Sequence, residues 1–293
     1  MIHLRMIFYD KETESMIPEG FIGLANTNPL RKNLFEVEPI LRFITENQIN
    51  DSDFYGFFSP RIFEKTGLDA NDICSLDEKQ FHRFDIISLD PGPVNLEQFQ
   101  NSVAQGERGH GDFRWRFEYL ISAINSSKKL YLDKFINFRV PERYFLLSHY
   151  FIAKGSFWKS WAVIVNEIFQ FESSDQRYNE IINSRCLYER NPTEYTYIVF
   201  LIERVAGLIA FSENLTICEA FLRTRWLNEF NKRKWPKALV SIGSYLYKLE
   251  FAMRGANQRP FIAHFVVKKL IYIYTVIDNR LKYFMKQERS RLN

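Results

Sequence analysis

An adjacent pair of opposite charges, Glu203 and Arg204, interrupts the otherwise apolar residues 194–211, EYTYIVFLIERVAGLIAF. Apolar residues recur at helical spacing over the second half of this segment, which predicts a helix with Glu203 near the start of its inner face. Moving an unpaired charge out of water costs at least several kcal/mol. The two groups are therefore either an ion pair satisfied within the core, or a catalytic or ligand-holding carboxylate with its arginine partner at the wall of a polar pocket.

The charge of the chain is unevenly distributed. The net charge of +4 combines residues 223–293, where 16 Lys and Arg face four acids, with residues 1–222, where 23 basic groups face 31 acids. The tail carries +12 and the body −8. A basic tail points to an anionic partner, either membrane phospholipid or nucleic acid. Apolar bulk alternates with Lys and Arg there, so we expect amphipathic helices whose basic face is either merely solvated or bound to a bilayer surface.

The cysteine pattern and the hydropathy bear on the compartment. Cys74, Cys186 and Cys218 are far apart and form no CxxC motif, which is typical of free thiols in a reducing compartment. The first residues contain no apolar core of signal-peptide length. No window reaches roughly 18 uninterrupted apolar residues. We therefore expect an intracellular protein that does not span a membrane.

Strand and helix patterns alternate along the first 222 residues. The predicted strands are residues 3–9, 21–24, 53–58, 84–89 and 144–153, the last with His149 in its middle as a hydrogen-bonded core residue. The predicted helices are 35–44, 59–66, about ten residues ending at 104, 115–125, 157–169 and the second half of 194–211. Ser59 is expected to be the N-cap of its helix and Gly67 the stop. A polar connector is expected over 172–193. This order predicts an α/β fold.

Two polar segments are candidate ligand loops. Residues 18–33, PEGFIGLANTNPLRKN, follow the first strand, where open α/β sheets often bind ligands. Residues 105–113, QGERGHGDF, place three glycines among charged residues and predict a flexible polar loop. This second segment is either a surface turn or part of a site. One His and two acids at this spacing match no recognised metal-ligand pattern.

The order of several short segments carries a resemblance to a known group. They are GFIGLANTNPLRKNLFEVEPI, DFYGFFSPRIFEKTGL, FDIISLDP, QGERGHGDF, YFIAKGSFW and VFLIERVAGLIA. As an ordered set over residues 3–215 they resemble bacterial glycosyltransferase-like proteins of surface-polysaccharide synthesis, distantly similar to the nucleotide-sugar transferases of GT-A type. The resemblance implies a GT-A-like, Rossmann-like mixed sheet flanked by helices over residues 1–222. The basic helical extension, residues 223–293, lies outside it.

The resemblance also implies a donor site near the carboxyl ends of the first strands. Its residues would be Asn26, Asn28, Arg31, Tyr55, Ser59, Asp85 and Asp90, with Lys32 and Arg108 as further cations for the diphosphate. The metal-holding Asp-x-Asp of such enzymes is absent, because Asp85 and Asp90 are too far apart in DIISLD. The resemblance therefore implies either a metal-independent transfer or Mn²⁺ or Mg²⁺ at an atypical site.

The catalytic residues that the resemblance implies come from two segments. Glu107 and His110 would contact the transferring sugar or its phosphate. Glu203, oriented by Arg204, would be the general base for the acceptor hydroxyl, a role typically worth about 10²–10⁴-fold in rate.

We therefore expect a cytoplasmic glycosyltransferase, peripheral on the inner face of the cell membrane through residues 223–293. It would move a sugar from a nucleotide-sugar donor to a lipid-linked or growing saccharide of O-antigen or capsule. Two alternatives stay open. One is a nucleic-acid-binding protein that uses the basic tail with Trp226 and Trp235 as stacking groups. The other is a catalytically inactive scaffold of a polysaccharide-synthesis complex.

Overall fold

The structure is a computed structural model that describes residues 1–89, 99–124, 130–188 and 191–220. Its contacts divide the chain into two compact units, Met1–Phe221 and Leu222–Asn293. Asp90 and the predicted basic extension over residues 223–293 lie outside the described residues.

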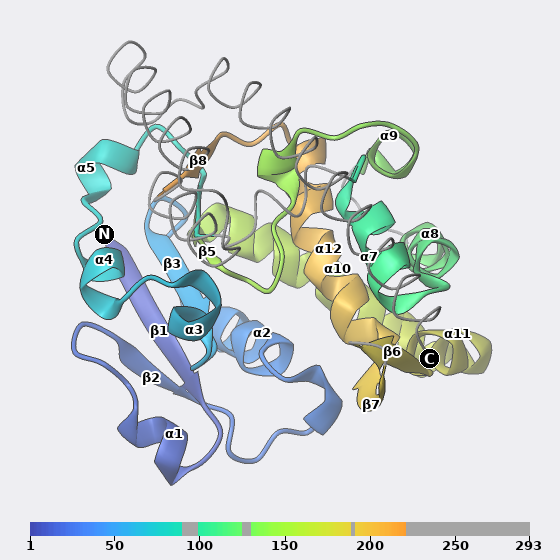
Figure 1. Ribbon diagram of the computed structural model, residues 1–293, viewed down its shortest axis with the longest axis horizontal. Coiled ribbons are helices and arrows are strands. Elements are labelled where there is room, and N and C mark those ends of the chain that lie inside the picture. The colour runs from blue at the N-terminus through green and yellow to red at the C-terminus, as the bar shows by residue number, and fades with distance from the viewer. Residues whose placement is uncertain (90–98, 125–129, 189–190, 221–293) are drawn as a thin grey trace, which may run out of the picture. The chain divides into compact units, whose positions relative to one another are not determined.

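A mixed six-stranded sheet lies at one side of the first unit, and helices α10 and α12 lie next to it (Figure 1). Its strands are β1 (Ile2–Phe8), β2 (Ile22–Ala25), β3 (Phe54–Phe58), β4 (Ile86–Ser88), β5 (Phe151–Lys154) and β8 (Ile217–Glu219). Their spatial order is β2-β1-β3-β5-β4-β8. Strand β5 runs antiparallel to both neighbours, and the other pairings are parallel. The carboxyl ends of the parallel strands and the start of β5 therefore meet at one edge.

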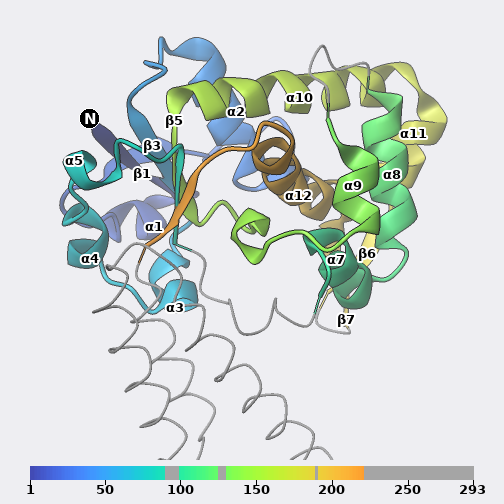
Figure 2. The ribbon, with the colours of Figure 1, turned by 90° about the horizontal axis from the view of Figure 1, so that it is seen from above.

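Side chains alternate between the two faces of the sheet along each strand, and in the central strands β3 and β4 both faces are buried. In β3, Phe57 packs into one core with helices α2 (Val37–Glu46), α10 (Gly155–Ser174) and α12 (Tyr197–Ser212). Phe54 and Phe58 point into a second core with α3 (Ile62–Thr66), α4 (Ala70–Cys74) and α5 (Glu78–Phe81). Figure 2 shows the two groups of helices on opposite sides of the strands. This arrangement confirms the α/β fold with helices flanking a mixed sheet.

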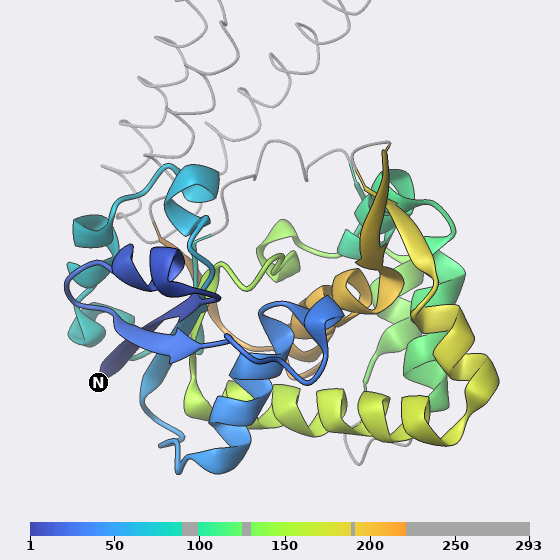
Figure 3. The ribbon, with the colours of Figure 1, turned by 90° about the horizontal axis from the view of Figure 1, so that it is seen from below.

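Helix α10 is fixed to the sheet by one tryptophan. Trp158 is fully buried, and its Nε1 donates a hydrogen bond to the backbone oxygen of Tyr55 at 2.9 Å. Its ring stacks on Phe151 with centroids 5.2 Å apart. The helix begins at Gly155, where a Cβ would lie 2.1 Å from the backbone oxygen of Asn50. This close approach to the Asn50 carbonyl requires glycine at position 155. Helix α2 runs beside α10 (Figure 3).

A further layer of short elements covers α12 on the side away from the sheet (Figures 1 and 2). It consists of α7 (Ser102–His110), α8 (Phe113–Ala123), α9 (Leu132–Asn137), α11 (Gln176–Ile182) and the hairpin of β6 (Arg185–Tyr188) with β7 (Asn191–Thr196). Short α1 (Lys11–Ser15), η1 (Lys32–Leu34) and η2 (Glu142–Tyr144) complete the described elements. Within the described ranges, no helix combines the length and the apolar character that crossing a bilayer requires.

Most of the predicted elements are present, and five details were wrong. The predicted helix ending at 104 lies partly outside the described residues, and its described part is helical only from Ser102, where α7 begins. Within residues 144–153 the strand begins only at Phe151, because Ser148 and His149 each have a left-handed φ of 54°, which is incompatible with extended structure before it. Residues 105–110 belong to helix α7 despite their glycines, since Asn101 caps its first turn. Arg61, not Ser59, is the N-cap of α3. The predicted connector over 172–193 contains α11 and the β6–β7 hairpin. The three cysteines are free thiols, as predicted.

Two glycine substitutions test the packing of α10. Gly155→Ala would force a methyl group against the Asn50 carbonyl, and we expect it to lower the free energy of unfolding by about 1–3 kcal/mol. Gly109→Ala is the matched control, because no atom lies within 4 Å of the added Cβ in helix α7. It should raise the free energy of unfolding by up to about 1 kcal/mol, as alanine favours helix. Urea unfolding of both variants measures this, and equal effects would refute the close contact.

Candidate active site

A cleft of about 500 Å³ opens at the edge of the sheet where the parallel strands end. It is lined by the segments that follow β1 and β3, the residues around the start of α2, the residues before β5, and the first half of α12. Strand β2 lies on one side of β1 and β3 on the other, so the strand order reverses here. Open α/β sheets bind their ligands in the crevice at such a point. The cleft is therefore the candidate site.

Glu203 lies in the middle of α12 and lines this cleft, with 15% of its side chain exposed. Burial raises its pKa from 4.5 to about 7, and the charge of Glu36 adds to the rise. The nearby Arg204 and a hydrogen bond from the Ser148 hydroxyl oppose the rise without cancelling it. A carboxylate with a pKa near the operating pH is suited to both taking up and releasing a proton.

Arg204 holds Glu203 from the core side of α12. It is 2% exposed, and its Nη1 donates to the Glu203 carboxylate at 2.5 Å and to the Phe200 carbonyl at 3.1 Å. Its Nη2 donates to Oε1 of Gln105 in α7 at 2.6 Å. The two alternatives for the pair that the sequence left open therefore combine. Arg204 lies in the core, where both of its Nη atoms have acceptors and its Nε has no partner among the described residues, and Glu203 reaches the cleft.

Glu36, which the sequence analysis missed, is a second carboxylate in the cleft. It immediately precedes α2 and is half-buried. Burial raises its pKa, although a hydrogen bond from the Tyr9 hydroxyl and one from its own backbone oppose the shift. Burial and the Glu36 charge also raise the pKa of Tyr9. The two carboxylates and Tyr9 thus form one electrostatically linked group in the cleft.

Strained backbone is concentrated around these carboxylates. Five non-glycine residues of the described part have positive φ, and Phe35, Ser148 and His149, three of the five, line the cleft. A non-glycine residue in this region costs on the order of 1–3 kcal/mol, and such strain persists mostly at functional sites. Asn26 holds one strained turn, because its Nδ2 donates to the Phe35 carbonyl at 2.9 Å.

The segment after β3 contributes positive charge to the cleft. Arg61 and Lys65 line the cleft beside Ser59, and Arg61 also pairs with Glu64 at 3.1 Å. Ser59 is buried and its hydroxyl is hydrogen-bonded to that of Tyr150. Burial raises the pKa of Tyr150 to about 12, so its hydroxyl stays protonated at neutral pH. The cleft therefore offers two cations as well as two carboxylates.

Of the donor-site residues that the resemblance implied, the structure places Ser59 in the cleft. Asn26 supports the cleft through Phe35, and Asn28 is exposed on its loop. Arg31 pairs with the buried Glu172 and lies over the Phe169 ring at 4.5 Å. Tyr55 is a core residue of β3, with its ring stacked on His3 and its hydroxyl accepting from the Asn50 amide. Asn28, Arg31 and Tyr55 do not line the cleft.

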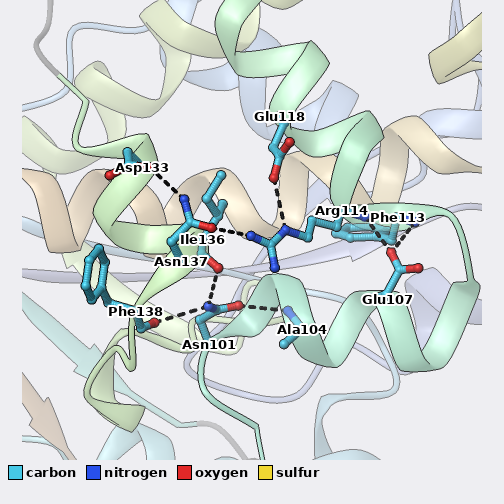
Figure 4. A network of polar contacts seen from close by, with 10 residues as sticks. All are labelled: Asn101, Ala104, Glu107, Phe113, Arg114, Glu118, Asp133, Ile136, Asn137 and Phe138. Atoms are coloured by element: carbon cyan, nitrogen blue, oxygen red, sulfur yellow. Dashed lines mark hydrogen bonds and ion pairs between the residues drawn. The ribbon is translucent and has the colours of Figure 1, made fainter.

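Glu107 belongs to α7, and its carboxylate lies at the start of α8 (Figure 4). Its Oε2 accepts hydrogen bonds from the backbone amides of Phe113 and Arg114 at 2.7 and 2.6 Å. A carboxylate there compensates the unsatisfied amides of a helix N-terminus. In the same network, Asn101 caps α7 and donates to the Ile136 carbonyl before the end of α9. Glu107 therefore joins α7 to α8 and does not line the cleft.

His110 and Asp85 also lie outside the cleft lining. The His110 ring is buried and stacks on Phe200, a lining residue, with centroids 4.0 Å apart. Burial alone would raise the pKa of Asp85, but hydrogen bonds from Thr216 and Lys154 outweigh it and lower the pKa. Asp85 therefore ties β4 to the strand that follows α12. No group of three or more His, Cys, Asp or Glu side chains suited to a metal ion gathers in the described ranges.

The raised pKa of Glu203 predicts a stability change that depends on pH. As the pH rises above 4.5 the unfolded chain releases this proton first, whereas the folded chain holds it until about pH 7. The stabilisation is therefore complete below pH 4.5 and is lost by pH 7, a change of up to about 3 kcal/mol in the free energy of unfolding. Glu203→Gln should lack this loss.

Urea unfolding at several pH values between 4.5 and 7.5 measures the difference. Glu180→Gln, an exposed position on α11, is the control and should follow the wild-type curve. Parallel curves for the wild type and Glu203→Gln would place the Glu203 pKa in its ordinary range.

Comparison of the chain with protein-family profiles, with curated proteins and with solved structures finds no match.

Proposed function

We propose that the chain is a glycosyltransferase that moves a sugar from a nucleotide-sugar donor to a lipid-linked or growing saccharide in bacterial surface-polysaccharide synthesis. The observation that carries this proposal is the Glu203 carboxylate, whose pKa is raised to about 7, in a cleft at the carboxyl ends of the parallel strands. The GT-A-like identity of the fold is part of the same proposal. It is supported by the mixed sheet and by the resemblance of the ordered segments.

In the proposed reaction Glu203 is the general base. The acceptor hydroxyl attacks the anomeric carbon of the donor sugar, and its proton passes to the Glu203 carboxylate. A glycosidic bond forms as the bond from the anomeric carbon to the phosphate oxygen breaks, and the electron pair leaves with the nucleoside diphosphate. Arg204 fixes the carboxylate through the 2.5 Å contact, so little reorganisation precedes the transfer.

The leaving diphosphate gains negative charge and needs compensation. Arg61 and Lys65 are the cations that line the cleft in the described residues, and we assign them this role in place of Arg31. Preorganised cations in a partly dehydrated site stabilise developing charge by several kcal/mol. The aromatic rings of Tyr195, Phe200 and Phe35 offer apolar surfaces for a base or a sugar ring.

The role of Glu203 can be tested by transfer assays. Glu203→Gln keeps the shape of the side chain and should lower the rate about 10²–10⁴-fold, because the amide cannot accept the proton. In the wild type the rate should rise with pH through about 7, as the carboxylate ionises. Glu180→Gln should retain the wild-type rate and pH profile. An active Glu203→Gln enzyme with the same pH profile would refute the assignment.

The donor class can be found by thermal shift. UDP-, GDP-, CMP- and dTDP-sugars would be tested with the full chain, each with and without Mn²⁺ or Mg²⁺. A ligand at a hundred times its Kd adds about 2.7 kcal/mol to the free energy of unfolding. Stabilisation by one nucleotide class would support the transferase. Whether that stabilisation requires Mn²⁺ or Mg²⁺ would decide whether donor binding depends on a metal ion. Stabilisation by none would favour the inactive scaffold.

The charge of residues 223–293 supports a partner at an anionic surface, and we propose the inner face of the cell membrane. The net charge of +12 is interleaved with apolar bulk, which a purely phosphate-facing surface would not need. Co-sedimentation of the full chain with phosphatidylglycerol vesicles should exceed that with phosphatidylcholine vesicles and weaken with salt. Equal, weak binding to both vesicles together with a salt-dependent shift of an oligonucleotide would favour nucleic acid instead.

A further inference from the structure

The cleft contains a charge that the proposed transfer step does not use. Glu36 lines the same cavity as Glu203, yet the described residues supply it with no cationic ion-pair partner, whereas Glu203 has Arg204. Its hydrogen bonds come from the Tyr9 hydroxyl and a backbone amide. A carboxylate accepts about four hydrogen bonds, so Glu36 has capacity for further donors. A half-buried carboxylate without a cation is costly unless a ligand supplies such donors.

Two further polar atoms beside Glu36 also lack partners. His149 lines the cleft, is 4% exposed, and its Nε2 has no hydrogen-bond partner within the described ranges. The buried Oδ1 of Asn26, which holds the turn that precedes Glu36, is likewise unsatisfied. Buried polar atoms are rarely left in this state in native proteins. Both atoms have almost no accessible surface, so a ligand in the cleft would meet the half-buried Glu36 carboxylate and not these two atoms. A ligand rich in hydroxyl groups would supply the donors that this carboxylate can still accept.

We propose that the Glu36 carboxylate and the Tyr9 hydroxyl form a subsite that binds two hydroxyl groups of a hexose, the sugar carried by the donor. This inference rests on the proposed function. Two hydroxyls of one sugar can donate to the two oxygens of a carboxylate, and hydrogen bonds to an ionised acceptor are about twice as strong as neutral ones. Tyr9 holds the carboxylate in place, while the rings of Phe35 and Tyr195 pack against the sugar.

The subsite and the cations come from different segments of the chain. Glu36 and Tyr9 come from the segments after β2 and β1, and Arg61 and Lys65 from the segment after β3. A nucleoside diphosphate alone would meet Arg61 and Lys65, and its sugar ester would also meet Glu36. Substitution of Glu36 should therefore reduce the affinity for the ester and leave the affinity for the free nucleotide unchanged.

The test compares wild type, Glu36→Gln and Tyr9→Phe by calorimetric titration of the full chain with UDP and UDP-glucose, GDP and GDP-mannose, and dTDP and dTDP-glucose. We expect Glu36→Gln to raise the Kd of the bound sugar nucleotide about 10- to 100-fold, with the Kd of the matching nucleotide unchanged. The Kd of Tyr9→Phe for the sugar nucleotide should lie between those of the wild type and Glu36→Gln. Glu46→Gln removes the same charge from the exposed end of α2, and it should match the wild type.

A second probe keeps this inference separate from the proposed function. Methyl glucoside and methyl mannoside are tested by saturation-transfer NMR, which needs no nucleotide binding. Loss of a methyl hexoside signal in Glu36→Gln without nucleotide binding by any protein would uphold the subsite and overturn the transferase. Equal weakening of nucleotide and sugar nucleotide, or no effect of Glu36→Gln on either probe, would overturn the subsite. Binding of neither probe to the wild type would overturn both.

The stability of the variant checks that the effect is one of binding. Glutamine keeps the shape of Glu36 and can still accept from Tyr9, but it carries no charge. The melting temperature of Glu36→Gln should therefore equal or exceed that of the wild type, because a half-buried charge without a cationic ion-pair partner has been removed. A clear fall would identify Glu36 as a structural residue.

Discussion

The burial of one ion pair inside an apolar helix sets the arrangement around the cleft. Arg204 cannot lie in the core of α12 without acceptors, and it takes them from Glu203, Gln105 and the Phe200 carbonyl. Desolvation costs several kcal/mol per ion, so these acceptors are needed together. Helix α7 must therefore pack against α12, and Glu203 is left facing the cleft. The contact between Arg204 and Glu203 therefore both satisfies part of a buried charge in the core and positions Glu203 at the candidate site.

The edge of the sheet adds a second constraint, because chain segments far apart in sequence must end at one place. Strand β5 runs against its neighbours, so the residues before it, and not after it, reach the cleft. The left-handed turn at Ser148 and His149 makes this entry. The positive φ values of Phe35, Ser148 and His149, all of which line the cleft, come at a cost in local stability.

The sequence predicted the parts whose signal is periodic or chemically exceptional. Strands β1 and β3 follow from short apolar runs and helix α10 from its helical spacing, and Glu203 was singled out because charge is rare in such an apolar segment. Glu36 was missed because a glutamate at the start of a helix usually faces solvent. Arg31 appeared to be a free cation, since its partner Glu172 lies 141 residues away. The loop predicted at residues 105–113 failed because the Asn101 cap and the packing of Gly106 on Phe113 favour helix.

The parallel pairing of the strands also has a consequence for the order in which the chain folds. Strands β1 and β3 pair across an intervening strand and helix, and β3 then pairs with β5 almost a hundred residues later. Contacts so distant in sequence require the closure of large loops before they stabilise anything, which slows folding. The cleft joins Tyr9 to Glu203 and depends on all of these pairings. We therefore expect the cleft to be completed late in folding, after the helices that line it have a sheet to pack on.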